Sequence, residues 1–371
     1  PTHVVIRLDH LAHNLQQIRQ RLRKKKNKMA VVKANAYGHG AVAVSEAALK
    51  AGASHLAVSC LEEGAQLREA GITAPILVLG LSLPEQADWY GRYNLTATVS
   101  SAAALPALAA AAQRWRSQIQ VMLTVDTGMG RIGVLPPDLV ALAKAVASCP
   151  ELVRAGVFSH FATADEPGGS ALADLQAERF FGTCAQLEAA GMASGLRTLS
   201  NSAAILQLPD THADMVRAGI ILYGLPPAPG LAPLMRGFKP VMEWYTKIVY
   251  LKEVDAGVPI SYGATYTTTE RTHIATLPVG YADGYSRRLS NQASVLIRGR
   301  RYPVVGRVCM DQLMINLGPQ PPAFGIGEPV TLVGTSGAET ITFTDLADLA
   351  GTINYELTCL ITPRVSRLFQ A

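Results

Sequence analysis

The sequence has few cysteines, few charged residues and no long apolar run. Of its 371 residues only five are cysteine and 16% are charged, whereas 49% are hydrophobic. The cysteines are scattered, odd in number and without CxxC spacing, which argues against a disulfide framework or a zinc site and favours a reducing compartment. No apolar run reaches the roughly 18 to 20 residues that span a bilayer. We therefore expect a globular protein with no metal site and no membrane segment.

The chain also carries little net charge. The formal net charge is +5, and part of it lies in one basic run at residues 21–28. No aromatic residues interleave with this run and no second basic patch supports it, so a solvated helix end leading into a strand is favoured over a surface for nucleic acid or anionic lipid. The first residues lack the pattern of a signal peptide. We expect a cytoplasmic protein that does not bind nucleic acid.

Short apolar runs alternate with helical segments over the first two thirds of the chain. Buried strands that alternate with helices indicate a parallel sheet, and about eight such units are typical of a (β/α)₈ barrel. A doubly wound open sheet is the alternative, disfavoured because no Gly-rich dinucleotide motif follows the first strand. The expected strands lie at residues 3–8, 29–34, 55–59, 76–79, 97–99, 119–125, 155–159, 198–200 and 216–222.

The pattern changes after a proline-rich link at residues 226–233. From residue 241 onward, alternating apolar runs are separated at short intervals by Gly and Pro, which is typical of an all-β domain. Only residues 344–350 are expected to be helical there. We therefore predict a (β/α)₈ barrel over residues 1–233 and a domain of β-strands over residues 234–371.

A lysine at the end of a buried strand is the first residue that suggests chemistry. Lys33 closes the run that begins at Met29, and a barrel places its active-site groups at strand ends. Burial lowers a lysine pKa by disfavouring the ammonium, and a neutral amine can form a Schiff base with an aldehyde cofactor. A lysine that extends into solvent is the alternative. The turn that follows favours the cofactor, because Tyr37 lies beside Gly38 and offers a hydroxyl to a phosphate.

Other polar groups follow later strands of the predicted barrel. Arg131 ends a glycine-rich loop and His160 ends the next apolar run, and each alone is weak evidence. Asn201, Ser202 and Arg217 lie in the last barrel turns, where small residues and backbone N–H groups often bind phosphate. We expect Arg217 to point into the mouth of the barrel. In the second domain several tyrosines stand beside glycines, which as single features usually mark turn packing.

Nine segments in series resemble the alanine racemase family, which depends on pyridoxal 5′-phosphate. They are AVVKANAYGHG, DTGMGRIG, HFATADE, NSAA, RAGIILYG, SYGATY, VGYADGY, GRVCMDQ and INYE, in the family's order and spacing between about residues 29 and 357. The resemblance implies an N-terminal barrel that binds the cofactor and a C-terminal β domain. It also implies a homodimer in which each active site is completed by the partner's β domain.

The resemblance further implies roles for single residues. Lys33 holds the cofactor covalently and exchanges the substrate's Cα proton on the D face, and Tyr262 of the partner exchanges it on the L face. Arg131 lies near the cofactor's phenolic oxygen and the substrate carboxylate, Arg217 faces the pyridine nitrogen, and His160 packs against the ring. The remaining implied contacts are Tyr37, Asn201, Ser202, Gly219, Ile220 and Tyr355 to the cofactor, and Met310 and Tyr281 at the substrate side.

One departure from the family lies seven residues before Arg131. In many members a carbamylated lysine there positions the arginine by its negative charge, whereas this chain has Thr124, which cannot carry a stable carbamate. The one carboxylate within the loop is that of Asp126. We expect it to accept hydrogen bonds from the N–H groups of residues 128 or 129. Two interpretations remain open, a bound chloride beside Arg131 or a water held by the Thr124 hydroxyl.

The expected activity is the racemisation of alanine in a bacterium, with D-alanine used for peptidoglycan. Racemisation removes a proton from one face of Cα and returns one to the other, so two bases must flank the substrate. Lysine and tyrosine have ordinary pKa values of about 10.4 and 10, so burial and neighbouring cations must lower them. The alternatives are a serine or broad-specificity racemase, a non-catalytic cofactor-binding protein, and a fold-related decarboxylase. Tyr262 and Met310 argue against a non-catalytic cofactor-binding protein. The decarboxylase would need a site for a long polar side chain, and the sequence marks none.

Overall fold

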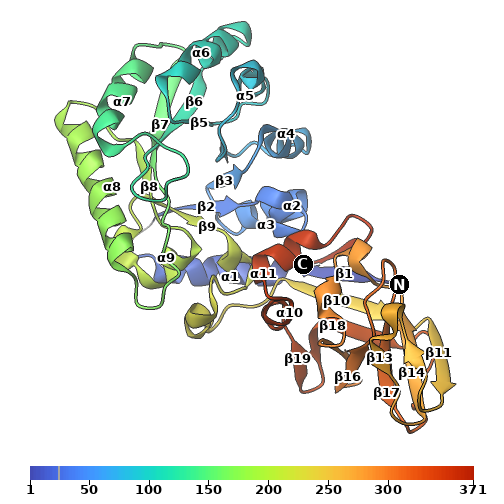
Figure 1. The fold of residues 1–371 in the computed structure, drawn as a ribbon. Helices are drawn as coiled ribbons and strands as arrows, with labels where there is room; N and C mark the ends of the chain where they lie inside the picture. The colour runs from blue at the N-terminus through green and yellow to red at the C-terminus, as the bar shows by residue number, and fades with distance from the viewer. Residues whose placement is uncertain (24–25) are drawn as a thin grey trace. The chain divides into compact units, whose positions relative to one another are not determined.

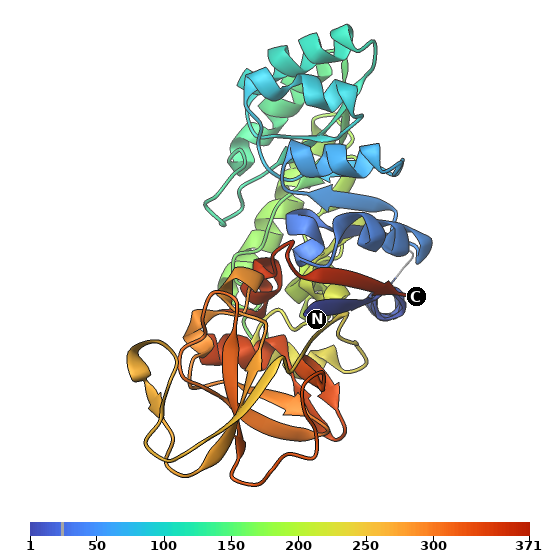
Figure 2. The ribbon, with the colours of Figure 1, turned by 90° about the vertical axis from the view of Figure 1, so that its right-hand side faces the viewer.

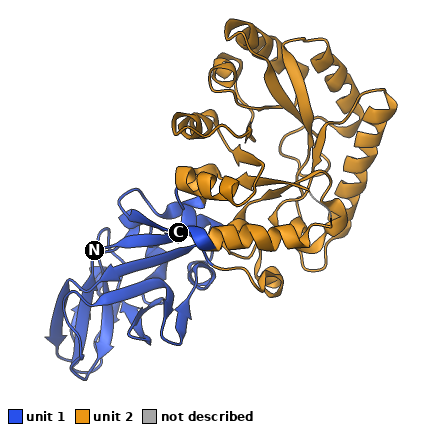
Figure 3. Ribbon diagram, turned by 180° about the vertical axis from the view of Figure 1, so that it is seen from behind, with its two compact units in different colours: residues 1–9, 37–40, 240–371 blue, residues 10–36, 41–239 orange. Residues whose placement is uncertain are grey.

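The computed structural model describes residues 1–23 and 26–371, which form two compact units. Unit 1 comprises residues 1–9, 37–40 and 240–371, and unit 2 comprises residues 10–36 and 41–239 (Figure 3). In this grouping by contacts, the first nine residues and the segment 37–40 pack with the C-terminal part of the chain. The expected domain boundary after residue 233 stays a prediction.

Unit 2 is built around eight parallel strands (Figure 1). A parallel bridge between Leu77 and Thr96 joins its two four-stranded sheets on one side, and the N–H of Asp214 donates to the Arg197 carbonyl on the other. The strands therefore follow one another in sequence order around a ring, which confirms the (β/α)₈ barrel. The sheets are β4 (Ile76–Val78), β3 (His55–Val58), β2 (Asn27–Val31) and β9 (Met215–Ala218), and β5 (Ala97–Val99), β6 (Ile119–Thr124), β7 (Leu152–Phe158) and β8 (Leu196–Thr198).

The helices of the barrel alternate with its strands and turn their apolar faces inward. In α6 (Leu105–Arg114), for example, Leu105, Leu108 and Ala111 are buried at helical spacing. The helical segments predicted between the strands are present. The last strand is shorter than predicted, because residues 220–223 form a 3₁₀ turn. The other helices are α1 (Leu8–Arg21), α3 (Ala41–Lys50), α4 (Leu61–Glu69), α5 (Asp88–Arg92), α7 (Leu139–Ala147), α8 (Ala171–Ala189) and α9 (Ser202–Gln207).

The basic run at residues 21–28 lies between a helix end and a strand, as expected, although Lys24 and Lys25 are outside the described residues. Arg21 ends α1, donates to the Leu234 carbonyl and lies over the Phe238 ring. Arg23 forms an ion pair with Asp210. The two arginines of the run therefore bind other residues of unit 2.

Unit 1 contains a large, mainly antiparallel sheet in the order β11-β14-β17-β16-β15-β18-β10-β1-β20. Figure 2 shows the first strand, β1, beside the last, β20, and these two pair in parallel. The strand predicted at residues 3–8 therefore belongs to this sheet and not to the barrel. The strands are β1 (His3–Arg7), β10 (Met242–Lys247), β11 (Tyr250–Val254), β14 (Thr272–Leu277), β15 (Ser294–Ile297), β16 (Arg300–Val305), β17 (Leu313–Gly318), β18 (Pro329–Ser336) and β20 (Ser366–Gln370), while β19 (Glu339–Ile341) pairs with β18.

Unit 1 also contains two helices. The helix predicted at residues 344–350 is present as α10 (Phe343–Ala350), with Thr342 and Asp345 forming a capping box at its start. The helix α11 (Asn354–Leu360) was not predicted, so the expectation of a single helix in this part of the chain was wrong. Within residues 1–23 and 26–371, no helix is long and apolar enough to cross a membrane.

Candidate active site

Lys33 stands where the chain leaves β2 and enters a left-handed turn. Residues 34–37 all have positive φ, between 52° and 55°, although none of them is glycine. The N–H of Ala36 donates to the Val32 carbonyl across this turn. Left-handed backbone costs a non-glycine residue roughly 1–2 kcal/mol, so the segment persists only because its surroundings hold it. Strain of this kind beside a strand-end lysine is typical of a functional site.

Arg217 lies buried in the barrel, with 3% of its surface exposed. Its guanidinium donates to the carbonyls of Thr198, Ser159 and Leu199 at 2.9, 2.7 and 3.2 Å. Its Nη2 also lies 3.1 Å from Nδ1 of His160. Because arginine can only donate, Nδ1 must accept, which places the proton of a neutral His160 on Nε2.

Three cations of unit 2 act on His160. Burial lowers the pKa of His160 to about 3, and the positive charges of Arg217, Arg131 and Lys33 add to this effect. Burial, with a smaller contribution from Arg131, also lowers the pKa of Arg217 to about 10, so this arginine stays charged at neutral pH. A neutral histidine among three cationic side chains at strand ends suits an anionic ligand. The structure thus brings together four of the residues that the sequence singled out.

Two turns next to each other supply backbone donors. Asn201 caps α9 by accepting from the N–H of Ala204, and the Ser202 hydroxyl accepts from the N–H of Gly219 at 3.0 Å. Ile220 begins the 3₁₀ turn that follows β9. The first N–H groups of a helical turn have no partner within it, so this pair of turns suits a phosphate.

The loop after β6 is stabilised by a carboxylate of its own. Oδ1 of Asp126 accepts from the N–H groups of Gly128 and Gly130 at 2.9 and 3.0 Å. The expectation that Asp126 organises the turn is therefore confirmed, with Gly130 in place of residue 129. Thr124 ends β6 and is 2% exposed.

In unit 1, residues 37–40 pack against α11. A Cβ at Gly38 would lie 2.0 Å from the carbonyl oxygen of Thr358, so glycine is required at this position. The rings of Tyr37 and Tyr355 have centroids 6.1 Å apart. Burial, with a smaller contribution from Cys359, raises the pKa of Tyr37, which keeps its hydroxyl protonated as a hydrogen-bond donor.

Three expected site residues are exposed on unit 1. Tyr262 is 72% exposed, Met310 52% and Tyr281 41%. The N–H of Tyr281 donates to the Cys309 carbonyl, so the segments that hold Tyr281 and Met310 are adjacent. A Cβ at Gly280 would lie 2.3 Å from the carbonyl oxygens of residues 309 and 310, so this approach requires glycine.

The backbone on both sides of Tyr262 is held in an unusual conformation. Ser261 has φ of 67° and Ala264 has φ of 46°. The hydroxyl of Ser261 donates to the Arg307 carbonyl at 2.6 Å, which fixes the start of the turn. A large aromatic side chain presented to solvent by a strained turn is typical of a binding surface.

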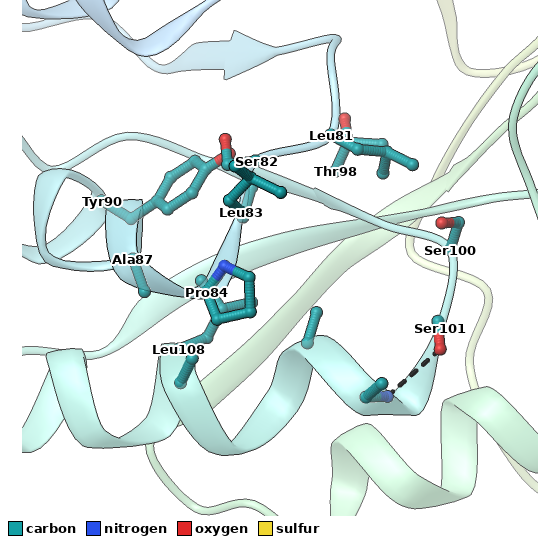
Figure 4. Close-up of a pocket in the computed structure, with 14 residues that line it drawn as sticks. Leu81, Ser82, Leu83, Pro84, Ala87, Tyr90, Thr98, Ser100, Ser101 and Leu108 are labelled. Atoms are coloured by element: carbon teal, nitrogen blue, oxygen red, sulfur yellow. Dashed lines mark hydrogen bonds between the residues drawn. The ribbon is translucent and has the colours of Figure 1, made fainter.

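A separate cavity of about 230 Å³ lies at the carboxyl ends of β4 and β5 (Figure 4). Leu83, Pro84 and Leu108 line it with the ring of Tyr90, whose hydroxyl lies 2.7 Å from that of Ser82. None of the expected site residues lines this cavity. It is therefore distinct from the group of cations around His160.

Sequence reasoning missed several groups that hold the expected residues in place. The carbonyls around Arg217 carry no side-chain signal and were not expected. Glu63, in the first turn of α4, accepts from the N–H groups of Ala34 and Ser59 at 2.5 and 2.7 Å. It is one of two adjacent glutamates and belongs to no motif. Its position at the start of a predicted helix was the only sequence signal of a possible role.

The low pKa of His160 predicts that the protein loses stability in acid. A histidine in the unfolded chain has a pKa of about 6.5, whereas that of folded His160 is about 3. Between these values the unfolded chain binds a proton that the folded chain does not, so the free energy of unfolding falls as the pH drops from 6.5 towards 3. His55 and His212, whose pKa values burial also lowers, act in the same direction.

Replacing His160 with Asn removes this titration and keeps an acceptor for Arg217. Urea unfolding between pH 7 and 4 should show a pH dependence that is weaker than that of the unchanged protein by up to about one proton. If the free energy of unfolding depended equally on pH in the two proteins, His160 would be protonated in the folded protein as it is in the unfolded chain.

Comparisons with known proteins cover both parts of the chain. The family described as "Alanine racemase, N-terminal domain" matches residues 6–227, and "Alanine racemase, C-terminal domain" matches residues 241–369. The alanine racemase of Symbiobacterium thermophilum is 47% identical over 369 residues, covering 100% of this chain and 97% of the relative.

Solved structures agree with this assignment. An alanine racemase of Clostridium difficile 630 superposes with a TM-score of 0.94 at 38% identity, covering 100% of this chain and 96% of that one. The alanine racemase of Bacillus anthracis with bound L-Ala-P gives 0.92 at 39% identity, covering 100% and 95%. The chain therefore belongs to the alanine racemase family.

Proposed function

We propose that this chain interconverts L-alanine and D-alanine with pyridoxal 5′-phosphate, and that Lys33 and Tyr262 are the two bases. The observation that carries the proposal is the gathering of Lys33, Arg131 and Arg217 around a neutral His160 at the carboxyl ends of barrel strands. The relatives of 47% and 44% identity, both named alanine racemase, support alanine as the substrate. The activity is that of an isomerase.

The residues of the site fit the cofactor. When bound, pyridoxal 5′-phosphate supplies an aldehyde that attaches amines and a ring that withdraws electrons from Cα. The turns that begin at Ser202 and Ile220 offer N–H groups to the phosphate. We propose, from the resemblance, that the hydroxyls of Tyr37 and Tyr355 also bind it. Lys33 is the anchoring amine, and His160 offers a neutral ring face.

We propose that Arg217 faces the ring nitrogen. Its bonds to carbonyls and to His160 come from Nη1 and Nη2, which leaves the Nε–H as the donor for that nitrogen. Because a charged arginine does not readily give up its proton, Arg217 would donate a hydrogen bond to the ring nitrogen without protonating it. An unprotonated ring would withdraw electrons less strongly, which would disfavour side reactions such as transamination.

The two bases act on opposite faces of the substrate. Nζ of Lys33 removes or returns the Cα proton on the D face, and Oη of Tyr262 does so on the L face, while Arg131 holds the substrate carboxylate. Tyr262 is too exposed in the single chain to work in a water-excluded site. We therefore propose a homodimer in which the partner's surface with Tyr262, Met310 and Tyr281 covers the barrel mouth.

The proposal extends to the place of the reaction. All five cysteines are free thiols, which suits the cytoplasm of a bacterium, and D-alanine made there is used for peptidoglycan.

A serine or broad-specificity racemase uses the same residues. Incubating the holoenzyme with L-alanine or L-serine and separating the enantiomers tests the choice: equal amounts of D- and L-alanine, formed faster than D-serine, are expected. Faster formation of D-serine would reassign the substrate.

Arg131 needs a negative partner on the side away from the cofactor. Arg131 is exposed in the single chain, but the proposed dimer would exclude water from it, and an unpaired charge there would cost several kcal/mol. Asp126 is already engaged with Gly128 and Gly130. The buried Thr124 stands where many relatives carry a charged lysine derivative. We propose that a chloride ion lies beside Arg131 there, a water held by the Thr124 hydroxyl being the alternative.

A chloride titration distinguishes the two occupants. At constant ionic strength, activity or thermal stability should rise with chloride to saturation and respond differently to fluoride or a bulky anion. Thr124→Lys, assayed with bicarbonate, should remove this dependence by restoring a covalent anion. A flat chloride response, with no anion density beside Arg131 in a crystal structure, would exclude the ion.

A further inference from the structure

One carboxylate joins the carboxyl ends of two neighbouring barrel strands. Oε1 of Glu63 accepts from the backbone N–H of Ala34 at 2.5 Å, and Oε2 accepts from that of Ser59 at 2.7 Å. Ala34 directly follows Lys33, and Ser59 directly follows β3. Glu63 itself lies on α4, the helix that leaves β3. The side chain therefore ties the peptide after Lys33 to the rigid end of the next strand.

The peptide that Glu63 holds is the first of the left-handed turn. Ala34 has φ of 52° and ψ of 51°, and the first N–H groups of a turn have no partner within it. Further along, the N–H of Ala36 donates to the Val32 carbonyl, and Oδ1 of Asn35 accepts from the N–H of Ala41 at 2.8 Å. These are neutral bonds, whereas Glu63 adds a charged acceptor, which binds an N–H more strongly. Glu63 thus holds the peptide that joins Lys33 to the turn.

We propose that Glu63 is a positioning residue for Lys33. By fixing the Lys33–Ala34 peptide and opposing the strain of the turn, its carboxylate sets the direction in which the lysine side chain leaves the strand. Glu63 contacts backbone groups and not the reacting atoms, so it acts through Lys33. The inference rests on the proposed function, in which Lys33 moves the proton on the D face of alanine.

The first test measures the hydrogen bonds without measuring activity. Glu63→Gln keeps the size of the side chain but has one acceptor oxygen for two N–H groups. Amide hydrogen exchange of the holoenzyme should become faster at Ala34 and Ser59. The matched control is Glu62→Gln, since Glu62 is the exposed neighbour whose carboxylate lies by the Cys60 thiol, and it should leave both amides unchanged. Unchanged exchange in Glu63→Gln would overturn the proposal.

The second test asks which face of the substrate is affected. A displacement of about 1 Å at a reacting group lowers a rate on the order of 100-fold, so kcat of Glu63→Gln should fall about 10- to 100-fold. Because the two enantiomers are equally stable, kcat/KM falls equally in both directions, and the rates alone do not identify the impaired base. Kinetic isotope effects do so, because proton removal by Lys33 becomes more rate-limiting.

We expect a larger primary isotope effect with α-deuterated D-alanine and no increase with α-deuterated L-alanine. A merely structural role would lower the amount of folded enzyme and leave both isotope effects unchanged, which would overturn the proposal. If Glu63→Gln does not fold, Glu63→Asp, which keeps the charge on a shorter side chain, is measured in the same way. Full activity of Lys33→Ala would contradict the proposed function instead, and the exchange result would still stand.

Discussion

Lys33→Ala is expected to abolish racemisation in both directions. Under the proposed function, the change removes the amine that anchors the cofactor and also one of the two bases. Loss of a positioned acid or base alone lowers a rate about 10²- to 10⁴-fold, so the combined loss should exceed this range. Separation of alanine enantiomers after long incubation measures the residual activity. Lys50→Ala is the control, because Lys50 is exposed at the end of α3, and it should retain full activity.

The same lysine should be the site of covalent attachment. Reduction of the holoenzyme with borohydride fixes the cofactor to the amine that holds it, and peptide mass spectrometry locates the adduct. We expect it on Lys33, because the strained turn places this residue at the mouth of the barrel among the cationic groups. An adduct on another lysine would contradict the assignment.

Mixing two inactive variants is expected to restore activity. Lys33→Ala chains keep Tyr262, and Tyr262→Phe chains keep Lys33, so a mixed dimer with shared sites has one intact site and one doubly altered site. With random exchange, half of the dimers are mixed, and about one quarter of all sites should be active. The 72% exposure of Tyr262 in the single chain is the structural reason for this expectation.

The recovery needs a matched control. A mixture of Lys33→Ala with Lys33→Ala,Tyr262→Phe chains contains no intact lysine and should stay inactive under the same exchange conditions. Subunit exchange is verified with differently tagged chains. No recovery in mixed dimers that have been isolated would mean that each site is built from one chain.

Much of the barrel could be predicted because its signals are local. Each strand is a short apolar run and each long helix repeats at helical spacing, so the order of units follows from the sequence alone. The strand at residues 3–8 shows where this reasoning ends. Its apolar run resembles those of the barrel, but β1 pairs with β10 and β20, which lie more than 200 residues away in the chain. A local pattern carries no information on such a partner.

The site shows the same limit. Lys33, Arg131, His160 and Arg217 stand in motifs, whereas their supports do not. The left-handed turn could not be predicted, because alanine and tyrosine usually avoid positive φ, and one asparagine does not indicate four such residues in a row. Glu63 acts through backbone N–H groups, which every residue possesses, so its role became visible only from distances.

Hydrogen exchange during racemisation tests the central claim most directly. The holoenzyme is given L-alanine labelled with deuterium at Cα in ordinary water, and the first D-alanine formed is analysed by mass spectrometry. If Tyr262 removes the deuterium and Lys33 delivers a different hydrogen to the opposite face, this D-alanine carries hydrogen from solvent. Absence of D-alanine would contradict the activity, and D-alanine that retains the deuterium would contradict the two bases.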